Sequence, residues 1–512
     1  MKKNLILILV SVLVCGSFSS CQKWLEETDY TYAIATSTFY NTPGEASAAV
    51  LSVLDNMRSA FNSNWYASLE INTEYIYPKG VYQASGDYEG ITNTTHLQRC
   101  GSNYQYLFRA IMRCNTPLSR LPEANDMTPA EIDAYMGELY FLRAYNYWML
   151  VRTFGGVPLR TEENMYTWDL AKSTPAQVYE LIVSDLQKAV KTCPDVERYK
   201  GTPCKNAAKA VLAGVYMDLK KYSEAKSLTA EVIASGQYQL VPVKTPVEFN
   251  EKVFGEAVHN TPEEVFYIKT NMTDSKTWDY LSYTSKTGWL YDGVHTICQT
   301  GYYTHYTDLD NPVIKDWDKA DLRRDLNIIF MPFGVDAYGA NTCLLIKYRA
   351  PNSSGSKAEV DIPMLRYTDV LLTYAEACAR TGETAKGIEV LNQIKRRAYG
   401  ADINTPNPAL DYKAGDYADF NSFLYGPLLT EERYETFNEA KHWFFEERLG
   451  IWEELVQKNY RVACPWPRKD MGSIGREITV AQKCHLWKIP AEEFNYNKAM
   501  DEAKDQNPGY TN

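Results

Sequence analysis

The spacing of hydrophobic residues predicts a long buried helix in the first third of the chain. Between Glu138 and Arg152, apolar side chains recur at i, i+3, i+4 and i+7, at Phe141, Ala144, Tyr145 and Trp148. The opposite side is apolar too, with Leu139, Leu142, Met149 and Leu150. We therefore expect this helix to be buried almost all round. The Gly155-Gly156 pair and Pro158 predict its end.

Further stretches show the same helical period. Apolar stripes at 208–219 and 225–233 are separated by a short break, and Gly236 is a candidate C-terminal cap. A second pair occupies 364–398 with a turn at Thr381-Gly382-Glu383, and a single helix with a wide apolar face is predicted over 431–460. Helical pairs joined by tight turns are the unit of tetratricopeptide arrays. The pattern predicts a mainly α fold: an irregular tetratricopeptide-like α-α superhelix with long aromatic-rich loop insertions.

The helical period is absent from 62–95, 241–348 and 401–423. The first two segments mix Tyr and Trp with Ser, Thr, Asp and Asn, and binding residues collect on such loops. Stacking on an aromatic ring buries the apolar face of a sugar, while polar side chains bind its hydroxyls. We predict ligand contacts by Tyr66, Tyr82, Tyr88, Trp278, Tyr280, Tyr283, Trp289 and Tyr291. The alternative is that these rings pack loops onto the scaffold or contact a partner protein.

The N-terminus has the pattern of a lipoprotein signal peptide. Lys2 and Lys3 precede a ten-residue apolar run, which is too short to span a bilayer, and small residues then lead to Cys21. This predicts acylation of Cys21 and anchoring by lipid alone. Ordinary signal-peptidase cleavage, which would leave Cys21 free, is the alternative. No later window reaches 18 apolar residues, so we expect a tethered body outside the bilayer.

Charge and cysteine content limit which partners and which disulfide bonds can be expected. The chain has 512 residues and a net charge of −11, which disfavours nucleic acid as a partner. Its 11 cysteines are scattered, and the odd number that is left without Cys15 and Cys21 does not indicate a disulfide framework. Pairing of Cys193 with Cys204 stays open. The 39 Tyr and 11 Trp outnumber the 17 Phe, as expected where rings face ligands or partners.

Several sequence runs resemble the RagB/SusD family. They are ELYFLRAYNYWMLVRTFGGVPL (Glu138 to Leu159), IPMLRYTDVLLTYAEACARTG (Ile362 to Gly382), LNQIKRRA (Leu391 to Ala398), WKIPAEEFNYN (Trp487 to Asn497) and QNPGY (Gln506 to Tyr510). FEERLGIWEE (Phe445 to Glu454) is similar to a further family helix, although Leu449 and Ile451 differ from its commonest wording. The resemblance covers nearly the whole mature chain, and its motifs follow the family's order.

The resemblance implies a surface-exposed, lipid-anchored outer-membrane protein with a tetratricopeptide-like core. Such proteins bind glycans or peptides and cap a SusC-like TonB-dependent transporter. Because ligand rings in the family come from loops on the scaffold, we expect the two aromatic segments to converge on one face. Trp289 is the preferred stacking platform and Trp278 the second. The expected organisation is a signal peptide at 1–20, a tether at 21–40, an N-terminal helical region at 41–240, a ligand-loop insertion at 241–345 and a C-terminal RagB/SusD region at 346–512.

Common catalytic motifs are absent from the sequence. It has no G-x-S-x-G, no P-loop, no H-E-x-x-H and no C-x-x-C, and its six histidines lack metal-ligand spacing. Acidic pairs such as Glu446-Glu447 are interpreted as solvated helix faces or as ion-pair partners of Arg448. Arg366 and Glu376 are interpreted as a buried ion pair or as hydrogen-bonded anchors. We expect no enzyme activity, no cofactor and no metal, with calcium at the acidic residues 308–321 left open. A secreted glycan hydrolase and a tetratricopeptide-type protein adaptor are the alternatives.

Overall fold

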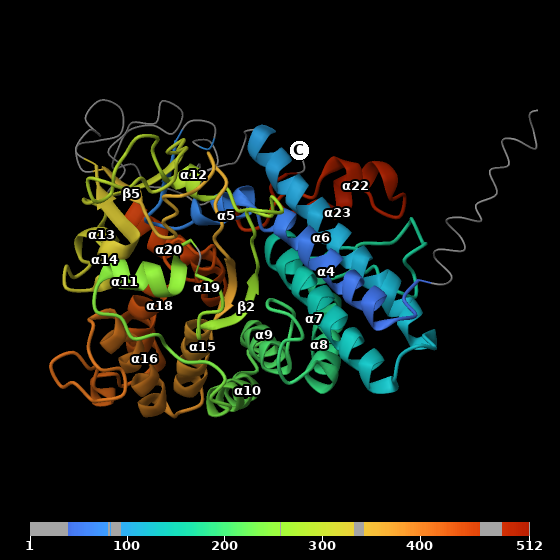
Figure 1. Ribbon diagram of the computed structural model, residues 1–512, viewed down its shortest axis with the longest axis horizontal. Helices are drawn as coiled ribbons and strands as arrows, with labels where there is room; N and C mark the ends of the chain where they lie inside the picture. The colour runs from blue at the N-terminus through green and yellow to red at the C-terminus, as the bar shows by residue number, and fades with distance from the viewer. Residues whose placement is uncertain are drawn as a thin grey trace, which may run out of the picture.

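The computed structural model describes residues 39–79, 82, 94–256, 258–331, 342–460 and 484–510. Helices dominate it, as the sequence predicts, and most lie next to their neighbours along the chain (Figure 1). The N-terminal half comprises α4 (Pro43–Ala60), α5 (Ser63–Glu70), α6 (Thr94–Arg120), α7 (Pro129–Phe154), α8 (Pro175–Thr192), α9 (Lys205–Asp218) and α10 (Tyr222–Ala234). The predicted helix at 138–152 is the buried C-terminal part of α7, and the predicted pair at 208–233 is α9 and α10.

A repeated local signal begins three of these helices. At α4, α7 and α8 a threonine precedes proline and stands three residues before Glu or Gln. The threonine hydroxyl accepts a hydrogen bond from the backbone N–H of that Glu or Gln, whose side chain accepts one from the threonine backbone. Proline suits the first turn because its missing N–H would have no helical partner there. The capping threonines are Thr42, Thr128 and Thr174.

The superhelix continues through the C-terminal pair α15 (Tyr367–Arg380) and α16 (Thr384–Ala398), because α15 packs on α10 and α9. Gly382 lies in the turn between them at a φ of 81°, which favours glycine. The predicted start of this pair is wrong. Met364 belongs to strand β6 (Ile362–Arg366), which pairs antiparallel with β2 (Glu264–Ile268). The apolar side chains of β6 were therefore mistaken for a first helical turn.

The single helix predicted over 431–460 is also wrong. The structure has α18 (Leu429–Glu435), α19 (His442–Leu449), α20 (Trp452–Leu455) and a π-helical turn, η6 (Val456–Tyr460). The backbone is left-handed at Asn438, Ala440 and Gly450, with φ of 61°, 59° and 70°. A right-handed helix cannot pass through such residues. The apolar period continues across the breaks because every piece packs against the core.

The segment without helical period contains a small antiparallel sheet. Its strand order is β1-β3-β5-β4, formed by β1 (Tyr77–Pro78), β3 (His305–Asp308), β5 (Thr342–Leu345) and β4 (Ile328–Phe330). Strand β1 comes from the N-terminal half, so the sheet joins residues more than 220 positions apart. Short helices surround it: α11 (Pro246–Phe249), α12 (Leu281–Thr284), α13 (Pro312–Lys315) and α14 (Leu322–Asn327), with the π-helical turn η3 (Asn250–Phe254).

The remaining described elements are short. They are the 3₁₀ turns η2 (Leu121–Glu123) and η4 (Ala414–Asp416), helix α17 (Phe420–Phe423), the π-helical turn η5 (Leu424–Leu428), and the C-terminal helices α22 (Ala491–Tyr496) and α23 (Glu502–Asp505). Among the described helices, none is long and apolar enough to cross a membrane.

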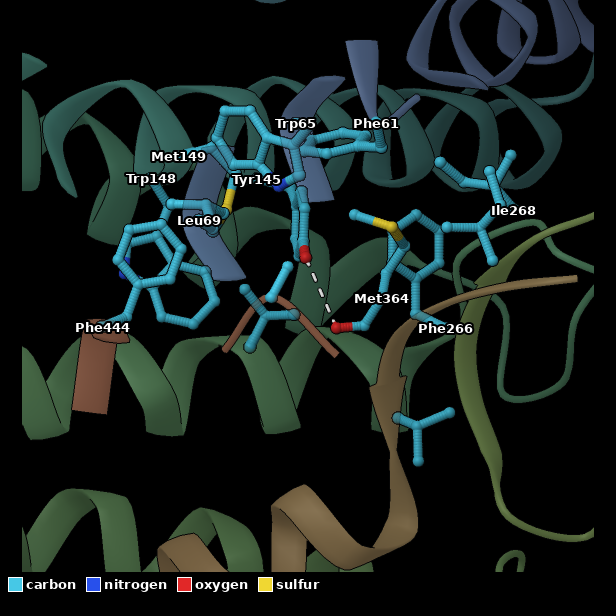
Figure 2. Close-up of a cluster of buried hydrophobic side chains, with 14 of the residues drawn as sticks. Phe61, Trp65, Leu69, Tyr145, Trp148, Met149, Phe266, Ile268, Met364 and Phe444 are labelled. Carbon is cyan, nitrogen blue, oxygen red and sulfur yellow. Dashed lines mark hydrogen bonds between the residues drawn. The ribbon is translucent and has the colours of Figure 1, made fainter. Parts of the chain in front are cut away.

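The core is rich in aromatic rings and joins distant elements (Figure 2). Tyr145 of α7 contacts Phe266 of β2 with ring centres 5.4 Å apart, and its hydroxyl lies 3.5 Å from the carbonyl oxygen of Met364 in β6. Trp65 of α5 meets Trp487 near the C-terminus at 5.5 Å. Cys193 and Cys204 are both buried free thiols.

Buried ion pairs cross the same core. Arg366 contacts Glu263, Glu435 and Glu439, while Glu376 accepts hydrogen bonds from Arg448. Both residues are buried anchors, as the sequence indicated, but each has its own partners. Desolvation of such charges is offset only when hydrogen bonds satisfy them, as they do here.

Candidate ligand site

The two aromatic segments meet in the structure. The ring of Tyr66 in α5 lies 4.8 Å from that of Trp278 and 5.2 Å from that of Tyr280. Tyr82 lies 5.6 Å from Tyr283, and α5 packs on α12. Both helices lie in the upper part of Figure 1. The rings from the two segments are therefore joined at one place in the fold.

Four of the predicted contact residues belong to the core below this place. Tyr66, Tyr82, Trp278 and Tyr280 each expose 2% or less of their surface. Their polar atoms and backbone are also engaged: the Tyr66 hydroxyl donates to the carbonyl oxygen of Pro363, the Tyr82 hydroxyl donates to Asn64, and Trp278 pairs with Ala358. A ring without an exposed face cannot stack on a sugar, so the expectation of Trp278 as a surface platform is wrong. These rings form the floor of the candidate site.

The exposed part is a loop at residues 286–302, which follows α12. Lys286 pairs with Tyr302 and Leu290 with Thr296, so the loop folds back on itself. Its turns use Gly288 and Gly293 at φ of 74° and 83°. Thr287 Oγ1 accepts a hydrogen bond from the Gly301 N–H at 2.9 Å, which fixes the base of the loop. This short network holds the loop over the aromatic floor.

The rings of this loop differ in exposure. Tyr302 is 58% exposed and meets the half-buried Tyr283 edge to face at 6.3 Å. Trp289 is half-buried against the core. Tyr291 packs between neighbours, with the Arg349 guanidinium 4.9 Å from its ring and the His295 ring 6.2 Å away. Tyr302 therefore offers the largest free ring surface of the four, although sequence analysis did not select it.

Polar groups surround these rings. Asp292 contacts the His295 ring and accepts hydrogen bonds from the backbone N–H groups of His295 and Val294. These contacts hold the pKa of the Asp292 carboxyl below the usual range. The Lys79 ammonium lies 3.8 Å from the ring of Tyr303, which is itself buried, and burial lowers the pKa of Lys79 to about 8. Charged and hydroxyl groups beside exposed rings suit the hydroxyl rim and apolar face of a sugar. Tyr88 and Cys21 lie outside the described residues.

A cavity of about 150 Å³ lies between α7, α9, α15 and α19 and reaches Tyr66 of the aromatic floor. Its wall includes Trp148, whose indole N–H donates to Asp218 at 2.6 Å, and Arg152, which covers the Phe444 ring at 3.8 Å. Figure 2 shows Trp148 and Phe444 facing each other there. Sites for small molecules usually measure about 300–1,000 Å³, so this cavity is too small for an oligosaccharide. Sequence analysis did not anticipate it.

Comparisons with known proteins place this fold in a family. A family model described as "Starch-binding associating with outer membrane" matches residues 23–217, and one described as "SusD family" matches residues 337–510. SusD-like protein P38 of Formosa agariphila is 23% identical over 490 residues, which cover 86% of this chain and 90% of that protein. The chain belongs to the SusD family.

Solved structures agree on the fold. A SusD homolog from Bacteroides thetaiotaomicron superposes with a TM-score of 0.74 at 21% identity, covering 93% of this chain and 99% of that one. A protein described as a laminarin-binding SusD-like protein gives a TM-score of 0.69 at 19% identity, covering 92% and 100%. These likenesses confirm the predicted tetratricopeptide-like scaffold. SusD family proteins are non-catalytic binding proteins, and the description of the first family model associates it with the outer membrane.

Proposed function

We propose that this protein captures an oligosaccharide at the cell surface and delivers it to a SusC-like TonB-dependent outer-membrane transporter. The observation that carries the proposal is the loop at 286–302, which holds the exposed ring of Tyr302 above a buried aromatic floor. A laminarin-binding SusD-like protein has the same fold, which supports a glycan as the ligand class.

The site suits binding without chemistry. Tyr302 and Tyr283 stand nearly perpendicular, at 83°, so one ring can stack on a sugar while the other borders it. Trp289 adds apolar surface beside them, and the loop's hydroxyl and carboxylate groups can accept or donate hydrogen bonds. Because the floor is already packed, little ordering is needed when ligand binds, and pre-organisation favours affinity.

The proposal also places the protein at the membrane through lipid on Cys21. A diacylglyceryl group with an N-acyl chain exceeds the two hydrophobic signals that stable anchoring needs. The body of the protein would then lie over the transporter, while the lipid keeps it attached to the membrane. The candidate glycans to compare are starch-like glycans, fructans, laminarin and host glycans, and peptides are the alternative class of ligand.

A binding panel tests this function. The soluble form that starts after Cys21 is titrated with laminarin, starch and fructan oligosaccharides, host glycans and peptides. We expect saturable binding to one glycan class, and Tyr302→Ala should weaken it about tenfold or more, equivalent to about 1–3 kcal/mol for a lost stacking ring.

The matched control is Tyr166→Ala, which removes a ring that is 75% exposed in the loop between α7 and α8. This variant should bind as the wild type does. Saturable binding to peptides alone would contradict the glycan proposal, and equal affinity of wild type and Tyr302→Ala would contradict the assigned site.

A further inference from the structure

A buried histidine and two carboxylates converge below the candidate site. His442 Nε2 lies 2.8 Å from Glu446 Oε1 and 3.7 Å from Glu74 Oε2. One ligand atom from each of the three residues lies within 4.8 Å of the other two. All three side chains are fully buried.

The fold brings this group together from the two ends of the chain. His442 and Glu446 are four residues apart on α19, so they share one face of that helix. Glu74 follows α5, about 370 positions earlier, just before the first strand of the small sheet. The spacing in sequence gave no signal, because Glu74 is remote and the histidines do not stand at metal-ligand spacing. The interpretation of Glu446 as a solvated helix-face residue is wrong, since its side chain is fully buried.

The facing atoms have no hydrogen-bond partners among the described residues. These atoms are His442 Nε2, both carboxylate oxygens of Glu446 and Glu74 Oε2, while Glu74 Oε1 is ion-paired with Arg433. The short approach of His442 Nε2 to Glu446 lacks hydrogen-bond geometry, so proximity there is not matched by a bond. Buried polar groups of native proteins are nearly always satisfied, and each exception requires an explanation.

The second nitrogen of the imidazole is held in the way that metal ligands are. His442 Nδ1 contacts the Glu432 carboxylate, which fixes the ring and directs Nε2 toward Glu74 and Glu446. Histidines that bind metals almost always pair their other ring nitrogen with a carboxylate or carbonyl group in this manner.

Further ionisable side chains are buried around these three residues. Glu70, Glu74, Glu432 and Glu446 are all buried here, and Glu70 has one further oxygen without a partner. Arg433 contacts Glu74 at 2.7 Å and is the guanidinium paired with this group. Four carboxyl groups, one guanidinium and one imidazole are thus buried together, and the desolvation of such a group must be offset by specific contacts.

We propose that Glu74, His442 and Glu446 bind one divalent transition-metal ion of the zinc class. Zinc takes imidazole nitrogen and carboxylate oxygen at about 2.0–2.2 Å, which places neighbouring ligand atoms about 3.3 Å apart in a tetrahedral site. The separations of 2.8 Å and 3.7 Å bracket that value. The ion would fasten the segment after α5 to α19 and so stabilise the support of the ligand site.

Metal analysis of the full-length protein in detergent tests the proposal. The protein is stripped with a chelator, and Zn²⁺ or Co²⁺ is then added back. We expect about one equivalent of metal per chain after desalting, a higher melting temperature, and the visible absorption of four- or five-coordinate Co²⁺. Glu74→Gln and Glu446→Gln should lose this stoichiometric retention, and Glu432→Gln should weaken affinity about 10–100-fold.

His485→Gln is the matched control. His485 also has two carboxylate neighbours, Glu447 at 2.9 Å and Glu453 at 3.0 Å, but it is partly exposed and they occupy opposite ring nitrogens. This variant should retain metal. If the two glutamine variants fail to fold, zinc-edge X-ray absorption of His485→Gln decides, and a shell with one imidazole nitrogen and carboxylate oxygens supports the site. A folded wild type that retains no metal, or bound metal without imidazole, would overturn it and show that the carboxylates share a proton instead.

Discussion

Trp278 is enclosed by other rings, and this determines what its removal should do. Tyr66, Tyr348 and Tyr280 lie 4.8 Å, 5.1 Å and 5.3 Å from it, and it is 1% exposed. Replacing a buried tryptophan by alanine costs about 3–5 kcal/mol, because contacts are lost and a cavity remains. We expect Trp278→Ala to lower the free energy of unfolding by that amount, as measured by urea denaturation.

Tyr302→Ala is the comparison for this stability measurement. Its ring is largely exposed, so the free energy of unfolding should change by no more than about 0.5 kcal/mol. The interpretation would be wrong if Trp278→Ala unfolded at the wild-type urea concentration but lost ligand affinity.

Sequence reasoning located the aromatic segments but could not sort their rings. Trp278 and Trp289 occupy the same aperiodic segment with similar neighbours in sequence. Trp278 is buried because Tyr66 and Tyr348, 212 and 70 positions away, cover it, and only the folded chain shows such contacts. For the same reason, the proximity of Glu74 to His442 could not be predicted from the sequence. Pattern identifies a loop that carries rings, whereas burial depends on distant partners.

His485 should make the stability of the fold depend on pH. Its hydrogen bond with Glu447 raises the pKa of the imidazole above the ordinary 6.5, and Glu453 acts in the same direction. A histidine whose pKa is higher in the folded state stabilises the fold below its unfolded pKa, and this stabilisation is lost as pH rises through the folded pKa. We expect His485→Gln to be less stable than wild type below about pH 6.5 and to match it at about pH 9.

The size of this effect is limited by solvent. The side chain is 32% exposed, so the difference should stay under about 1 kcal/mol. Melting curves of both proteins across the pH range measure it. A difference that grew with rising pH would show that the imidazole is not stabilised by these carboxylates.

At the scale of elements, the close crossing of α15 and α16 can be tested by substitution. A Cβ added at Gly387 of α16 would lie 2.6 Å from the carbonyl oxygen of Ala375 in α15, which is backbone and cannot swing away. Gly→Ala in a helix interior otherwise stabilises by about 1 kcal/mol. Here we expect Gly387→Ala to destabilise the protein by about 1–3 kcal/mol, because the two helices must separate.

Gly44→Ala in α4 is the matched control. The nearest atom to its added Cβ is Thr42 Oγ1 at 4.0 Å, so the substitution should be neutral or stabilising. Thermal unfolding of both variants measures the contrast. Equal melting temperatures would show that α15 and α16 cross less closely than the structure places them.

Element boundaries were predictable where a local signal fixes them. Gly236 and Gly382 end helices at positive φ, as the sequence indicated. The Thr-Pro-x-Glu/Gln signals that start α4, α7 and α8 were equally visible in sequence and would have located those helices. Gly450 carries such a signal within 431–460, whereas the break at 438–440 carries none, since Asn438 and Ala440 adopt left-handed backbone within a continuous apolar period. Tertiary contacts determine where the helix breaks at these residues.

At the scale of the molecule, the helical pairs and the ligand loop have different roles. The helices pack in sequence order, and the apolar period alone identified the buried part of α7 and the pairs α9–α10 and α15–α16, but not α4, α6 or α8. The small sheet, through β1, and the ion pair of Glu74 with Arg433 of α18 instead join residues from both halves. Such long-range contacts hold β3, against which α12 packs just before the loop at 286–302. The scaffold was therefore more predictable than the site.

The last prediction concerns the attachment of the whole molecule to the membrane. Cys21 follows a signal-peptide pattern, and the described helices include none that could cross a bilayer. Acyl chains on Cys21 would then be the means of anchoring. In cells lacking the transporter, we expect wild type in the outer-membrane fraction and Cys21→Ala in the periplasm or medium, as measured by fractionation and mass spectrometry of the N-terminus.

The transporter supplies the second half of this test. In cells that have it, gentle solubilisation of the tagged wild type should bring down a TonB-dependent barrel, because the proposed function requires a lasting contact between the two. Cys193→Ala, which removes a buried thiol outside the anchor, is the control and should remain in the membrane. Membrane-bound Cys21→Ala without the transporter would contradict the anchor. A wild type that purifies alone would contradict the partnership while leaving the anchor intact, because lipid attachment and barrel contact are separate interactions.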